Sequence, residues 1–135
     1  MERRDAYVRD SGAGVPLVCI HASASSSGQW RPLMDRLAGR FRTLAVDLHG
    51  SGKSPDWPAD RPLTLADEVA LLEPVFRGVG DRFHLIGHSY GGAVALKALI
   101  EGHLEQPMSG AEAADWLTAS VTRKPSRGRF AQRRI

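Results

Sequence analysis

The pentapeptide Gly87-His88-Ser89-Tyr90-Gly91 constrains the fold of this 135-residue chain more than any other feature. It follows an apolar run at residues 83–86, long enough for a buried strand, and precedes an apolar segment at residues 92–100 that indicates a helix. So tight a connection forces the central serine into a strained backbone conformation, and the glycines on either side let strand and helix approach without a Cβ clash. The free N–H groups of the helix N-terminus then point towards any anion formed beside the serine.

Two further apolar strands open into loops of small residues. The run at residues 17–20 ends in His21 and leads through a serine-rich loop to Trp30. The run at residues 43–46 leads into the glycine-rich loop 47–55. Strands alternating with helices predict an α/β fold with a mostly parallel sheet and flanking helices.

These three motifs, in this order, resemble the α/β-hydrolase superfamily over roughly residues 6–101, with Ala22 standing where that family usually has glycine. The family's domain is usually much longer, so the resemblance implies an incomplete α/β-hydrolase fold. We expect residues 1–101 to form the N-terminal part of such a domain, and residues 102–135 to form a divergent, partly disordered basic tail.

The resemblance also implies roles for individual residues. Ser89 matches the nucleophile of a nucleophile elbow, and the backbone N–H of Tyr90 matches one donor of the oxyanion hole. The second donor comes from the loop after His21, as the backbone N–H of either Ser23 or Ala22. A serine rather than an aspartate at position 89 argues against the dehalogenase and epoxide-hydrolase branches. It favours acyl chemistry on a small-molecule ester or related substrate.

The partners that would activate Ser89 are not evident. A serine hydroxyl needs a base, and in this fold the acid and the histidine follow the serine. The only histidine after Ser89 is His103. With a helix continuing to about residue 101, at about 1.5 Å per residue, His103 lies roughly 20 Å from the turn, far beyond a hydrogen bond of about 3 Å. His21 has a structural role in the family, and the turn directs the His88 side chain away from Ser89.

Two hypotheses therefore remain open. In the first, the chain is a serine-type hydrolase, or the N-terminal part of one, whose acid and base are missing from this sequence. In the second, it is a non-catalytic remnant that acts, if at all, through self-association or through its basic tail. The strand at residues 83–86 lacks an expected outer neighbour, and an unpaired apolar edge favours association.

The C-terminal segment differs in character from the rest. Residues 111–119 allow a short helix, and residues 121–135 contain six Lys or Arg and no acid, so that without these six the net charge falls from +3 to −3. One interpretation is a disordered end without a binding function. The alternative is a basic patch that binds nucleic acid or anionic lipid. The segment matches no nucleic-acid-binding module, so we expect no specific nucleic-acid partner.

Other functions are disfavoured. Gly52-Lys53-Ser54 ends like a phosphate-binding loop, but Asp47 stands where that motif needs its first glycine, and Pro55 opposes the required helix. The histidines show no metal-ligand spacing, and we predict no cofactor. No apolar run reaches the roughly 18 residues of a membrane helix, and no signal peptide is apparent, so a cytoplasmic location is the default expectation.

The remaining elements follow from periodicity. A short strand at residues 6–9 is expected to turn through a glycine-rich hairpin into the strand at Leu17. Residues 28–37 indicate a helix with Trp30 and Met34 on its inner face. Thr64 is suited to cap a helix that begins at Leu65.

Overall fold

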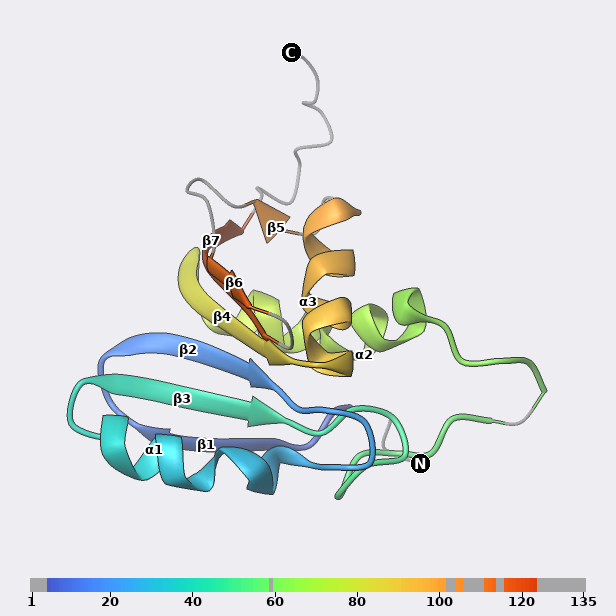
Figure 1. Cartoon of the computed structure of the whole chain (residues 1–135), viewed down its shortest axis with the longest axis horizontal. Coiled ribbons are helices and arrows are strands. Elements are labelled where there is room, and N and C mark those ends of the chain that lie inside the picture. Colours follow the sequence, from blue (N-terminus) through green and yellow to red (C-terminus); the bar gives the residue numbers. More distant parts are fainter. Residues whose placement is uncertain (1–4, 59, 102–103, 106–110, 114–115, 124–135) are drawn as a thin grey trace, which may run out of the picture.

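The computed structural model describes residues 5–58, 60–101, 104–105, 111–113 and 116–123. A sheet forms the centre of the molecule and helices lie on its two faces (Figure 1). The strands are β1 (Val8–Gly12), β2 (Val15–Ile20), β3 (Phe41–Val46), β4 (Arg82–His88), β5 (Leu104–Glu105), β6 (Ala111–Ala113) and β7 (Trp116–Arg123). The helices are the 3-10 turn η1 (Ser27–Trp30), α1 (Arg31–Leu37), α2 (Leu65–Gly78) and α3 (Tyr90–Ile100).

The strand order is β1-β3-β2-β4-β7-β5, with β6 paired to β7. The three central strands β3, β2 and β4 are parallel, and β1 and β7 add to them antiparallel. The predicted α/β class with a mostly parallel core is therefore confirmed. Because β2, β3 and β4 run in the same direction, their carboxyl ends meet at one edge of the sheet, where α3 begins (Figure 1).

Side chains of β2 alternate between two hydrophobic layers, as the period of two in a strand requires. Val18 and Ile20 pack with the apolar face of α2 and α3. Leu17 and Cys19 pack with Trp30 and Met34 from η1 and α1. The inner face predicted for residues 28–37 is thus confirmed.

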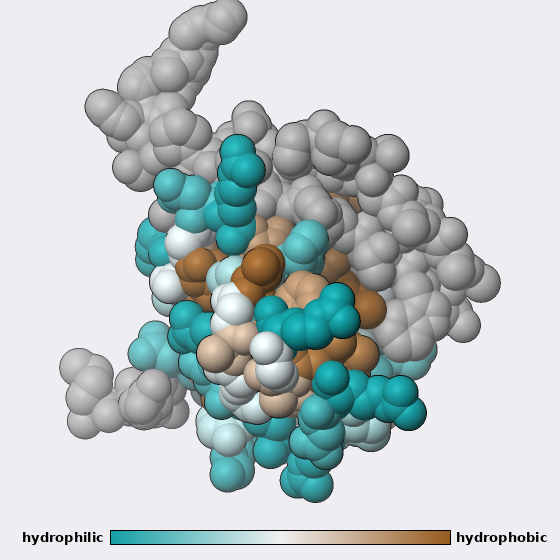
Figure 2. All heavy atoms as spheres, turned by 90° about the vertical axis from the view of Figure 1, so that its left-hand side faces the viewer, coloured by the Kyte–Doolittle hydropathy of each residue, from teal (hydrophilic) through white to brown (hydrophobic). Residues whose placement is uncertain are grey.

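The view onto the amino ends of β2 and β3, opposite the start of α3, shows hydrophilic side chains around a smaller apolar area (Figure 2).

The predicted hairpin between the first two strands is wrong. β1 pairs with β3 and not with β2, in the register Val8↔Val46 to Gly12↔Arg42. Gly12 and Gly14 have φ of +86° and +124°, and both lie so close to the backbone of residues 38–41 that neither has room for a Cβ. The glycines therefore carry the chain across the start of β3, so that β3 lies between β1 and β2.

Two expectations about the C-terminal segment are also corrected. The short helix expected within residues 111–119 is absent from their described parts, since Ala111–Ala113 and Trp116–Arg123 are strands. The outer edge of β4 is not unpaired, because β7 pairs with it from Arg82↔Thr122 to His88↔Trp116. The reason given for self-association, an open edge at β4, does not hold in this structure. Most of the basic residues of the predicted tail lie outside the described residues.

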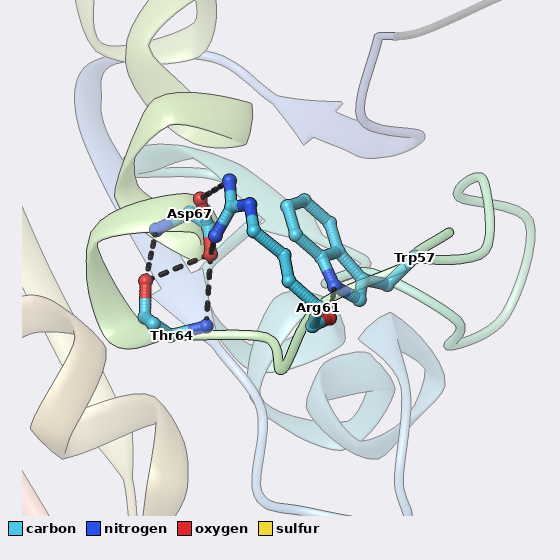
Figure 3. A network of polar contacts seen from close by, with 4 residues as sticks. All are labelled: Trp57, Arg61, Thr64 and Asp67. Atoms are coloured by element: carbon cyan, nitrogen blue, oxygen red, sulfur yellow. Dashed lines mark hydrogen bonds and ion pairs between the residues drawn. The ribbon is translucent and has the colours of Figure 1, made fainter. Parts of the chain in front are cut away.

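The start of α2 is held by a compact polar network (Figure 3). The Thr64 hydroxyl accepts a hydrogen bond from the Asp67 N–H, and the Asp67 carboxylate accepts one from the Thr64 N–H, which forms a capping box. The guanidinium of Arg61 binds the same carboxylate with both terminal nitrogens and lies 4.7 Å above the ring of Trp57. The predicted cap at Thr64 is confirmed, and α2 runs from this cap back towards the amino end of β4.

Candidate active site

Ser89 lies on the predicted sharp turn between β4 and α3. Its φ and ψ are 55° and −114°, a conformation that a residue with a side chain rarely adopts. Neighbouring glycines make the turn sterically feasible: a Cβ on Gly87 would lie 2.6 Å from the carbonyl carbon of Gly91, and one on Gly91 would lie 2.6 Å from the carbonyl oxygen of His21. The Ser89 side chain is exposed and makes no hydrogen bond with any other described residue.

Tyr90 directly follows this turn and opens α3. Within the described chain its backbone N–H has no hydrogen-bond partner, as expected for the first residue of a helix. Its phenol donates a 2.9 Å hydrogen bond to the Glu68 carboxylate, whose other oxygen accepts from the His49 N–H at 3.1 Å. Burial, followed by this bond and the charge of Glu68, raises the pKa of Tyr90 to about 12.

Glu68 was not predicted from the sequence. It belongs to α2 and is 1% exposed, although carboxylates are rarely buried so deeply. A signal was present, because Glu68 stands beside Val69 and four residues before Leu72 on the inward-facing stripe of the helix. An acid on such a stripe indicates a buried polar contact.

Ser23 lies on the exposed loop that follows β2. This loop reaches the Ser89 turn because Gly91 packs against the carbonyl oxygens of Ile20 and His21. The Ala22 N–H donates to the side-chain oxygen of Gln29 at 3.0 Å, whereas the Ser23 N–H has no partner among the described residues. Of the two backbone N–H groups considered for the second donor, Ala22 is therefore occupied and Ser23 is free.

The loop after β3 is built around a buried carboxylate. Asp47, 1% exposed, accepts hydrogen bonds from the N–H of Ser27 at 2.7 Å and of Lys53 at 2.9 Å. Gly52, with φ of +51°, lies against this carboxylate where a Cβ would clash. The acid thus fills the centre of the loop in which a nucleotide phosphate would have to lie, and residues 55–58 form no helix. These features agree with the argument against a phosphate-binding loop.

None of the four described histidines hydrogen-bonds to Ser89. His21 is buried, its Nε2 accepts from the Leu48 N–H at 3.0 Å, and its Nδ1 donates to the Ala22 carbonyl at 2.7 Å. This position between two loops agrees with a structural role. His88 Nδ1 contacts the Gln29 amide nitrogen at 3.0 Å, which directs its side chain to η1. His103 lies outside the described residues.

His49 and His84 make other contacts. The His49 ring packs edge-on against Trp57, and its Nδ1 is buried without a hydrogen bond among the described residues. His84 packs against Phe41 within the sheet. In the part of the chain that the structure covers, His, Cys, Asp and Glu side chains form no group of three or more that could hold a metal ion. Every helix in that part is too short or too polar to cross a bilayer.

Comparisons with known proteins agree with this architecture. Residues 17–134 match the Alpha/beta hydrolase family. The chain is 35% identical over 89 residues to a soluble epoxide hydrolase of Corynebacterium sp., covering 63% of this chain and 29% of that protein. It is 32% identical over 95 residues to a pimeloyl-[acyl-carrier protein] methyl ester esterase of Nitrosomonas europaea, covering 70% and 35% respectively.

Solved structures give the same result. An alpha/beta hydrolase from Sphaerobacter thermophilus superposes with a TM-score of 0.65 at 29% identity, covering 72% of this chain and 37% of that one. An esterase from Exiguobacterium antarcticum superposes with a TM-score of 0.65 at 30% identity, covering 70% and 35%. The chain spans about a third of the length of the relatives it matches. The family model matches residues 17–134, and the strained serine turn and the parallel core strands agree with it. The chain therefore belongs to the alpha/beta hydrolase family.

Proposed function

We propose that this chain carries the nucleophile half of a serine hydrolase that acts on ester or related acyl bonds. The observation that carries the proposal is the backbone of Ser89, held at φ 55° with its hydroxyl exposed at the carboxyl edge of the sheet. A strained conformation persists only where the surrounding structure enforces it, and such residues cluster at functional sites. Here the enforcing contacts are the close packing of Gly87 and Gly91.

In the proposed reaction the Ser89 oxygen attacks the carbonyl carbon of the substrate, and the carbonyl oxygen becomes an anion. The N–H groups of Tyr90 and Ser23 would donate to this oxyanion, since both lack partners among the described residues. Loss of one such donor in a serine hydrolase typically costs about 2.7–4 kcal/mol of transition-state stabilisation. The pair would therefore supply a large share of the rate enhancement.

The proton of Ser89 must pass to a base. None of His21, His49, His84 and His88 hydrogen-bonds to Ser89, so we assign the base and its acid to residues outside those that the structure describes. Without a base positioned at Ser89, acylation would be slow, and hydrolysis of the acyl-enzyme slower still. The chain would then be a weak esterase that retains its acyl group.

The relatives belong to several classes of hydrolase, and the residue at position 89 favours one of them. They include proteins named as an epoxide hydrolase, a haloalkane dehalogenase and a methyl ester esterase. The hydroxyl nucleophile at position 89 supports the ester branch of this set, as argued above for serine against aspartate. The substrate would be a small-molecule ester or another acyl compound.

The test is hydrolysis of p-nitrophenyl acetate by the wild-type chain and by Ser89→Ala. We expect the wild type to exceed the variant, because Ser89→Ala removes the oxygen that attacks the carbonyl carbon and leaves only attack by water. The matched control is Ser11→Ala, which removes a hydroxyl from an exposed serine of β1. Equal rates for the wild type and Ser89→Ala would remove Ser89 as the nucleophile, whatever the absolute rate.

A further inference from the structure

A single amide side chain, that of Gln29 in η1, joins the two segments that bear the proposed oxyanion donors. Its Oε1 accepts from the Ala22 N–H at 3.0 Å, and its Nε2 contacts the His88 Nδ1 at 3.0 Å. Ala22 directly precedes Ser23, and His88 directly precedes Ser89 and Tyr90. Gln29 therefore bridges the loop after β2 and the last residue of β4.

The direction of each hydrogen bond follows from the chemistry of the groups. The Ala22 N–H can only donate, so the amide oxygen of Gln29 must face it. The amide nitrogen then faces His88 and donates, which makes the His88 Nδ1 the acceptor. The bridge thus fixes both the amide orientation of Gln29 and the ring nitrogen of His88 that carries no proton.

The loop that contains Ser23 requires such support. Ala24, next to Ser23, has φ of +59°, a left-handed conformation that favours glycine. Ser23 and Ala24 are both exposed, so packing holds them only weakly. An oxyanion hole requires its donors within a few tenths of an ångström of the productive position, and a misplacement of about 1 Å can cost about a hundredfold in rate.

We propose that Gln29 is a positioning residue of the oxyanion hole. By binding the Ala22 N–H and anchoring it to His88, Gln29 leaves the Ser23 N–H as the free donor of the loop and holds it in register with the Tyr90 N–H. This inference rests on the proposed function. It adds a residue that touches neither the substrate nor Ser89 and acts only through the backbone of its neighbours.

The test uses phenylboronic acid on the full chain, because this probe requires no catalytic base. The Ser89 oxygen bonds to boron and its proton passes to water, which gives a tetrahedral anion in place of the acyl intermediate. Backbone amide resonances of Ser23 and Tyr90 report donation to that anion, and hydrogen exchange at the Ala22 amide reports the bond to Gln29. The variants are Gln29→Met, which keeps the length but loses both hydrogen bonds, and Ser25→Ala, a loop change that removes no hydrogen bond among the described residues.

In the wild type and in Ser25→Ala, we expect both resonances to shift saturably with the boronate, and in Ser89→Ala neither. In Gln29→Met the Tyr90 shift should remain, the Ser23 shift should be lost, and the dissociation constant should rise at least about tenfold. Exchange at the Ala22 amide should also accelerate. A merely structural role for Gln29 would weaken both resonance shifts alike. A Ser23 shift and an affinity like those of the wild type, or an unchanged Ala22 exchange rate, would overturn the proposal.

Failure of the proposed function gives a different result. If the wild type binds no boronate through Ser89, the proposed function is wrong, while the Ala22 exchange rate and the Ser23 resonance of the free chain still decide whether Gln29 sets the loop. If thermal melting shows that Gln29→Met does not fold, Gln29→Asn makes the same test, because its amide is one methylene too short to reach both partners. In Gln29→Asn, Ala22 exchange as slow as in the wild type contradicts the role of Gln29.

Discussion

The phenol of Tyr90 donates a 2.9 Å hydrogen bond to the buried carboxylate of Glu68, and this contact links the residue after the proposed nucleophile to helix α2. The other oxygen of Glu68 accepts a hydrogen bond from the N–H of His49, which lies in the loop after β3. One acid therefore joins the Ser89 turn to the loop after β3. The backbone N–H of Tyr90, the proposed oxyanion donor, belongs to a residue whose side chain is fixed at its far end.

This contact predicts an alkaline dependence of stability. The folded chain keeps the Tyr90 phenol protonated up to a pKa of about 12, whereas the ordinary pKa of a tyrosine, expected in the unfolded chain, is 10.0. Between pH 10 and about 12 the folded state keeps a proton on Tyr90 that the unfolded state loses. The contribution of this phenol to the free energy of unfolding is therefore fully present below pH 10 and is lost as the pH rises through about 12. We expect Tyr90→Phe to remove this part of the alkaline loss of stability in urea unfolding measured on both sides of pH 10. Tyr7→Phe is the control, and a slope unchanged by Tyr90→Phe would contradict the assignment.

The two helical glycines Gly91 and Gly78 should respond to alanine in opposite directions. A Cβ at Gly91 would lie 2.6 Å from the His21 carbonyl oxygen, whereas one at Gly78 meets nothing within 4 Å. We expect Gly91→Ala to lower the free energy of unfolding by about 1–3 kcal/mol through steric strain. Gly78→Ala should raise it by about 0.5–1 kcal/mol, because glycine loses more conformational freedom in a helix than alanine. Chemical denaturation measures both, and equal effects would show that the turn is not packed as described.

The network at the start of α2 predicts an acid dependence. Hydrogen bonds from Arg61 and then Thr64 hold the pKa of Asp67 well below the ordinary aspartate value of 3.8 (Figure 3). The contribution of Asp67 is therefore present above pH 3.8 and is lost as the pH falls below that value. Asp67→Asn should flatten the acid limb of the stability curve. The exposed pair of Glu73 and Arg77 offers a control, and a Glu73→Gln variant with an equal effect would argue against a special role for Asp67.

Cys19 should be unreactive in the folded chain. It is fully buried in β2, and burial raises the pKa of its thiol to about 12, so that little thiolate forms at neutral pH. Alkylation by iodoacetamide should proceed only as fast as the chain unfolds, and denaturant should accelerate it to the rate of a free thiol. Rapid labelling under native conditions would contradict the described packing of β2 between two layers.

The sequence was sufficient to predict the features that a single short segment determines by itself. The strained turn at Ser89 follows from glycines around a serine between strand and helix, and the cap at Thr64 follows from its position before an apolar stripe. The alternation of Val18 and Ile20 with Leu17 and Cys19 likewise requires only a period of two. The order of the three loop motifs was enough to indicate the family.

The features that escaped prediction depend on contacts between distant segments. Gln29 and His88 are 59 residues apart, and Glu68 and Tyr90 are 22 apart, so neither pair produces a local signal. The spacing of Trp116 and Leu117 fits a helix or a strand, and the free edge of β4 decides between them by pairing with β7. The glycine-rich turn after β1 has hairpin composition, but its packing on residues 38–41 sends β1 to the far side of β3.

Acylation of Ser89 is the most direct test of the proposed nucleophile. The chain is incubated with p-nitrophenyl acetate, digested and analysed by mass spectrometry, with Ser89→Ala treated in parallel. The proposal predicts an acetyl group on the peptide that contains Ser89, at a stoichiometry that grows towards one per chain, with no such gain in the variant. Acetylation spread over lysines with none at Ser89 would contradict it.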